Sequence, residues 1–112
     1  MKTFVILEDN QQKVDLVVNR LKLERNHLLV FRNVAAAKAV VSAIPEEMGK
    51  ITLILDGELE PGCGYGIDFL TWALAKFPQR IERVYTNSFS KRMNEEMAAL
   101  CEKIGVDVKS CF

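Results

Sequence analysis

Three acidic residues follow two apolar segments of the sequence. Glu8 and Asp9 come directly after residues 3–7, and Asp56 comes directly after residues 51–55. Short apolar runs of this kind are typical of buried strands. Ligands of open α/β sheets bind beyond the carboxyl ends of the strands, and carboxylate oxygens are the ligands that hard cations prefer. The spacing therefore predicts a site for a hard cation and a phosphate group.

Apolar runs alternate with amphipathic segments along the rest of the chain. Val14, Val17 and Val18 share one face of a helix that Asp9 or Asn10 can cap, which is the periodicity of a helix packed on a sheet. The segment between Asp56 and the third helix is rich in glycine and predicts a loop. We expect strands at residues 3–7, 28–31, 51–55, 81–85 and 106–108, and helices at residues 10–24, 34–44, 67–77 and 93–104.

Alternation of strands and helices with short connections predicts one α/β domain over residues 1–112. The expected fold is a three-layer, doubly wound, five-stranded parallel sheet in the order 2-1-3-4-5, without a fifth helix. The switch point of that order lies between the first and third strands. We therefore expect Glu8, Asp9 and Asp56 to converge although they are distant in sequence.

Composition excludes several classes of function. Fifteen basic residues balance fifteen acidic ones, so bulk charge gives no affinity for nucleic acid or for an anionic membrane. No apolar run is long enough for a membrane span or an export signal, and we expect a cytoplasmic protein. The spacing of Cys63, Cys101 and Cys111 favours free thiols over zinc ligands or disulfides, and His27 is interpreted as the lead-in to a strand.

Two further polar groups fall at the ends of the last two strands. Thr86 follows the fourth strand and Lys109 follows the fifth. Together with the acids they supply a carboxylate nucleophile, ligands for a divalent ion, a hydroxyl and a fixed cation. Transfer of a phosphoryl group to Asp56 needs this set, because the cations neutralise charge as it moves.

This arrangement resembles the receiver domain of two-component response regulators, along essentially the whole chain up to Lys109. In that family an acidic pair ends the first strand and the phospho-accepting aspartate ends the third. A threonine or serine ends the fourth strand about thirty residues later, and a lysine ends the fifth. The resemblance implies that Asp56 is the phospho-acceptor, Thr86 the switch hydroxyl and Lys109 the phosphate-pairing lysine.

The same resemblance implies a cofactor and partners. Mg²⁺ would be held by Glu8, Asp9, Asp56 and the backbone carbonyl of Glu58. A histidine kinase or another phosphodonor would supply the phosphoryl group. The family also continues into a fifth helix, so its lack in this chain predicts a homodimer or a partner protein on the open sheet face.

Several positions depart from the receiver pattern. Val106 stands where receivers usually place an aromatic residue, Ser110 replaces the proline that commonly follows the lysine, and Asn87 is bulkier than the usual small residue. We therefore do not expect the usual rotation of an aromatic ring behind the hydroxyl.

Parts of the sequence also resemble an atypical branch, the cyclic-phosphate processing receiver domains. The matching stretches are residues 55–59, residues 64–68 with Trp72, and residues 84–88. This branch implies a phosphoesterase that acts on cyclic phosphates. Its members tend to carry histidines where this chain has Gly57 and Tyr85, and general acid or base catalysis then lacks an imidazole.

Two other hypotheses remain open. Glu8 with the Asp56-Gly57-Glu58 segment resembles the metal-dependent nucleic-acid site of toprim domains, although that hypothesis leaves Thr86 and Lys109 unexplained. A degenerate receiver could instead serve as an interaction or dimerisation module through Phe69, Trp72 and the open sheet face.

Overall fold

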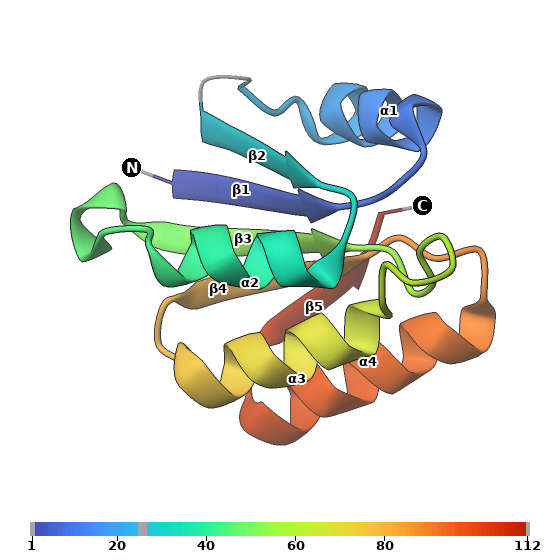
Figure 1. The fold of residues 1–112 in the computed structure, drawn as a ribbon. Coiled ribbons are helices and arrows are strands. Elements are labelled where there is room, and N and C mark those ends of the chain that lie inside the picture. Colours follow the sequence, from blue (N-terminus) through green and yellow to red (C-terminus); the bar gives the residue numbers. More distant parts are fainter. Residues whose placement is uncertain (1, 25–26, 112) are drawn as a thin grey trace.

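The computed structural model describes residues 2–24 and 27–111. Its five strands form one parallel sheet in the order β2-β1-β3-β4-β5, which confirms the predicted topology (Figure 1). Leu7 lies opposite Leu55 in the register, so the carboxyl ends of β1 and β3 lie side by side. The strands are β1 (Lys2–Leu7), β2 (Leu28–Phe31), β3 (Lys50–Leu55), β4 (Ile81–Thr86) and β5 (Asp107–Ser110).

The first helix, α1 (Gln11–Leu21), begins at the residue after Asn10. The Asn10 side-chain oxygen accepts hydrogen bonds from the backbone N–H groups of Gln12 and Lys13, which is the usual N-cap geometry. The helix ends before Lys22, whose φ of 54° is left-handed. The predicted end at residue 24 was therefore too late, because nothing in the apolar pattern indicated this turn.

The other α-helices lie close to the predicted segments, and a short 3-10 turn before β3 was not predicted. They are α2 (Val34–Ser42), η2 (Glu46–Met48, a 3-10 turn), α3 (Gly66–Lys76) and α4 (Lys91–Ile104). The last strand lies slightly later than the predicted 106–108, so Lys109 is inside β5 and pairs with Tyr85 rather than following the strand. Short edge strands carry a weak pattern, which explains this error.

Helices cover the two sheet faces unequally. In Figure 1, α2, α3 and α4 lie on one face and α1 lies on the other. The larger apolar cluster lies under α2 to α4 and includes Leu53, Leu55 and Phe69. Phe69 is fully buried there, so it is not available to a docking surface and that part of the interaction hypothesis was wrong. A smaller cluster under α1 contains Ile6, Val14, Val17, Val18, Ile54 and Cys111.

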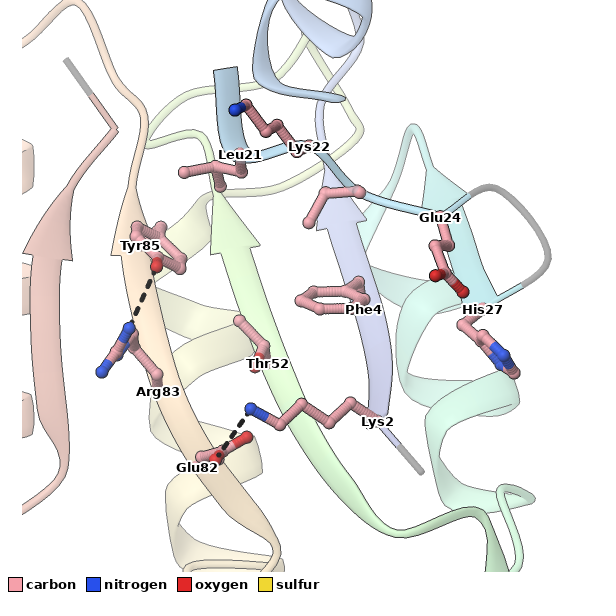
Figure 2. A pocket seen from close by; sticks show the side chains of 11 residues that line it. Lys2, Phe4, Leu21, Lys22, Glu24, His27, Thr52, Glu82, Arg83 and Tyr85 are labelled. Atoms are coloured by element: carbon pink, nitrogen blue, oxygen red, sulfur yellow. Dashed lines mark hydrogen bonds and ion pairs between the residues drawn. The ribbon is translucent and has the colours of Figure 1, made fainter. Parts of the chain in front are cut away.

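The sheet face that α1 packs against is only partly covered by that helix, and the rest of this face is open. Figure 2 shows Phe4, Thr52 and Tyr85 rising from neighbouring strands into a pocket of about 520 Å³. Among residues 2–24 and 27–111 no fifth α-helix covers this area. The pocket rim is polar and carries the Lys2–Glu82 ion pair and the hydrogen bond from Arg83 to the Tyr85 hydroxyl.

The three cysteines are free in the described part of the chain. Burial raises the pKa of Cys101 and of Cys111 to about 11, so both thiols are held in the unreactive, protonated form at neutral pH. None of the helices in the described ranges has the length and apolar character that crossing a bilayer requires.

Candidate functional site

The sheet topology brings the three predicted acids together. The Asp56 N–H donates to the Leu7 carbonyl, and the Glu8 N–H donates to the Phe31 carbonyl, so the strand ends are tied to one another. One carboxylate oxygen from each of Glu8, Asp9 and Asp56 lies within 4.8 Å of the others. Glu8 and Asp56 are buried and Asp9 is half-buried, so the cluster opens to solvent on the Asp9 side.

A buried lysine lies against this cluster. The Lys13 ammonium is 3.1 Å from Glu8 Oε1 and 3.6 Å from Asp56 Oδ1, and it donates to the Asn87 carbonyl at 2.8 Å. Only 7% of Lys13 is exposed. A charge removed from water in this way requires paired partners, and here two carboxylates provide them.

Both oxygens of Glu8 have protein partners. Oε2 accepts the backbone N–H groups of Asp9 and Asn10, while Oε1 faces Lys13 and the Asn87 side-chain amide. Burial raises the pKa of Glu8 from 4.5 to about 7, the Asp56 charge adds to this effect, and Lys13 opposes it. Glu8 therefore binds a proton more readily than a glutamate in water does.

The raised pKa of Glu8 predicts a pH-dependent stability. A carboxyl whose pKa is higher in the folded than in the unfolded state stabilises the fold fully below the unfolded value of 4.5. That contribution is lost as the pH rises through about 7. We expect the melting temperature of the metal-free protein to fall between pH 5 and pH 8, and to fall less in Glu8→Gln. A wild-type protein whose melting temperature rises over this range would contradict the assignment.

The loop after Asp56 forms the outer wall of the cluster. The Gly57 N–H donates to Asp56 Oδ1 at 2.8 Å, and the Gly66 N–H closes the loop on the Gly57 carbonyl at 2.9 Å. A depression of about 470 Å³ lies above the acids. It is lined by Asp9, Asp56, Glu58, Leu59, Glu60, Ser88, Phe89, Ser90 and Met93.

The structure places the other predicted residues differently. Glu58 lines the depression together with Asp9 and Asp56. Thr86 and Lys109 line a separate pocket of about 330 Å³ beside α4. No ion pair joins Lys109 to Asp56 among the residues that the structure describes, and Lys109 is exposed. The hydroxyl side chains that line the Asp56 depression are those of Ser88 and Ser90.

Sequence reasoning missed Lys13, Asn87 and Ser88 as site residues. Lys13 lies four residues before Val17, so it shares the sheet-facing side of α1. That position was a detectable signal, since a lysine on a buried stripe needs a charged partner. The signal for Asn87 is weaker, because its role depends on the chain path after β4.

The donor set fits a divalent cation. Asp9 and Asp56 offer carboxylate oxygens beside an open depression, and hard cations such as Mg²⁺ take oxygen ligands. Asn87 Oδ1 is buried without a hydrogen-bond partner in the described part of the chain. A buried acceptor of this kind requires a donor such as a metal-bound water. Because both Glu8 oxygens are already engaged, the freest ligands are Asp9 and Asp56.

Comparisons with known proteins identify the fold. No protein-family model matches the chain, and no curated protein matches it. Solved structures do match. A response regulator receiver domain from Rhodospirillum rubrum aligns with 96% of this chain and 78% of its own, at 17% identity and a TM-score of 0.70.

Two further response regulators of known structure have the same fold. The Mn²⁺-bound form of response regulator Rcp1 aligns at 21% identity and a TM-score of 0.68, over 98% of this chain and 80% of its own. The phosphorylated cyanobacterial phytochrome response regulator RcpA aligns at 18% identity and a TM-score of 0.66, over 97% and 78%. The chain therefore has the fold of response regulator receiver domains.

Proposed function

We propose that this protein is an atypical receiver domain that accepts a phosphoryl group on Asp56 with Mg²⁺ bound. The observation that carries the proposal is the convergence of three carboxylates within 4.8 Å at the carboxyl ends of β1 and β3. Such a cluster is costly unless cations neutralise it. A divalent cation bound there would neutralise the carboxylates and would also attract the oxygens of a phosphoryl group.

The reaction follows from the position of Asp56. One carboxylate oxygen attacks the phosphorus of the donor, the bond from phosphorus to the donor breaks, and its electron pair leaves with the donor. A mixed anhydride forms on Asp56. Mg²⁺, held by Asp9, Asp56 and the Glu58 carbonyl with Glu8 behind them, would neutralise phosphoryl oxygens. The donor would be a phosphohistidine protein or a small acyl phosphate.

The proposal has a direct test. Addition of Mg²⁺ and beryllofluoride to the purified chain should give a bound ¹⁹F signal, and acetyl phosphate should add the mass of one phosphoryl group. Asp56→Asn should lose both signals, because an amide oxygen is a poor nucleophile. Asp68→Asn, at an exposed position on α3, is the matched control and should keep them. A wild-type protein without either signal would overturn the proposal.

The alternative of a cyclic-phosphate phosphoesterase receives no support from the site. Such a reaction needs a general acid or base at the cleaved bond. His27, the only histidine in the sequence, lines the open-face pocket near the amino end of β2, whereas the acids lie at the carboxyl ends of the strands. Phosphoryl acceptance needs no imidazole on this chain, and we therefore favour it.

The proposal does not depend on the roles that the receiver resemblance implies for Thr86 and Lys109. Both lie beside α4, and their pocket does not include Asp56. A signalling role would also require a partner protein or a second copy to read the state of Asp56, and the open sheet face is the candidate surface for it.

A further inference from the structure

Lys13 is the cation nearest to the proposed acceptor in the described part of the chain. Its ammonium is held on three sides, by Glu8 Oε1 at 3.1 Å, by Asp56 Oδ1 at 3.6 Å and by the Asn87 carbonyl at 2.8 Å. The Phe89 ring lies over the fourth side, 4.2 Å from the ammonium. Four contacts from three parts of the chain fix this charge at one point.

The same contacts distinguish the two oxygens of Asp56. Oδ1 accepts the Gly57 N–H at 2.8 Å and faces Lys13 at 3.6 Å. Within the described residues no donor contacts Oδ2. Because one hydrogen bond and one ion pair both engage Oδ1, Oδ2 is the oxygen that remains available to an incoming group.

We propose that Lys13 is the catalytic cation of this site, and that it selects Oδ2 of Asp56 as the attacking oxygen. The inference rests on the proposed function. When Oδ2 bonds to phosphorus and the donor leaves with its electron pair, Oδ1 becomes the carbonyl oxygen of the mixed anhydride. Lys13 stays beside that oxygen and balances the negative charge that the phosphoryl group brings.

A lysine on α1 would thereby take the role that the receiver resemblance implies for Lys109. Lys109 is exposed, and the pocket that it lines does not include Asp56. Lys13 instead is almost completely buried against the reacting carboxylate. Electrostatic stabilisation is strongest where water is excluded, which favours the buried ammonium over the exposed one.

Substitution of each lysine separates the two assignments. With Mg²⁺ present, we expect Lys13→Gln to weaken beryllofluoride binding by about tenfold or more, as loss of a close charge implies. Glutamine keeps a donor for the Asn87 carbonyl. Lys103→Gln, at an exposed position on α4, controls for the loss of one positive charge. Lys109→Gln tests the competing assignment, and a loss there with none in Lys13→Gln would overturn the inference.

A second measurement uses the unmodified sequence and does not depend on the folding of a variant. In protein labelled with ¹³C at the lysine ε-carbons, beryllofluoride should shift the Lys13 signal while the Lys103 signal stays in place. Binding of beryllofluoride without a Lys13 shift would overturn the inference and leave the proposed function standing. If the wild-type protein binds no beryllofluoride at all, both fall together.

Discussion

Substitution of Lys13 by methionine is expected to destabilise the metal-free protein by about 3 kcal/mol at pH 8. Methionine fills the same space but leaves Glu8 and Asp56 as neighbouring buried carboxylates without their counter-ion. The loss should shrink toward pH 5, because Glu8, with a pKa raised to about 7, is then protonated. Urea unfolding at the two pH values, with EDTA present, measures both effects.

The same variant should respond more strongly to a divalent ion. Removal of Lys13 leaves the acidic cluster more negative, so Mg²⁺ should stabilise Lys13→Met by more than it stabilises the wild type. Lys103→Met removes an exposed lysine and should change the unfolding free energy by about 0.5 kcal/mol at most. Equal stability of Lys13→Met and wild type at pH 8 would show that the ammonium does not neutralise the acids.

Substitution of Gly66 by alanine is expected to cost about 3 kcal/mol or more. A Cβ atom at Gly66 would overlap the backbone carbonyl oxygen of Asp56. That oxygen belongs to the main chain and cannot rotate away as a side chain could. The loop would have to move, and with it the hydrogen bond from Gly66 to Gly57. Thermal unfolding followed by circular dichroism measures the loss.

A second glycine of the same loop provides the control. Gly62 has a φ of +86° and open space around the position of its missing Cβ. Asparagine tolerates left-handed backbone better than most residues, so Gly62→Asn should cost less than about 1 kcal/mol. A Gly66→Ala protein as stable as Gly62→Asn would contradict the close approach seen here.

The sheet order was predictable because two independent patterns agreed. Apolar runs of strand length alternate with helical periodicity, and short connections between them restrict the topology to a few arrangements. The ends of elements were less predictable. Lys22 ends α1 through a left-handed backbone conformation, and β5 is an edge strand in which burial gives little pattern.

The acidic part of the site was predictable for the same topological reason. Residues that follow adjacent parallel strands must lie at one edge of the sheet, so Glu8, Asp9 and Asp56 converge. The role of Lys13 was harder to predict from the strand order. Lys13 reaches the acids from a helix, and the contact depends on how α1 packs rather than on which residue ends a strand.

The position of Lys13 on α1 makes the site depend on the smaller of the two apolar clusters. Ile6, Val14, Val17 and Ile54 are among the residues that seat this helix on the sheet. Their packing sets the distance between the ammonium and the carboxylates, because it positions the helix that carries Lys13. Substitution of aliphatic residues beneath α1 would therefore change the pKa of Glu8 and the affinity of the acidic cluster for cations. No carboxylate would have to be replaced for this change.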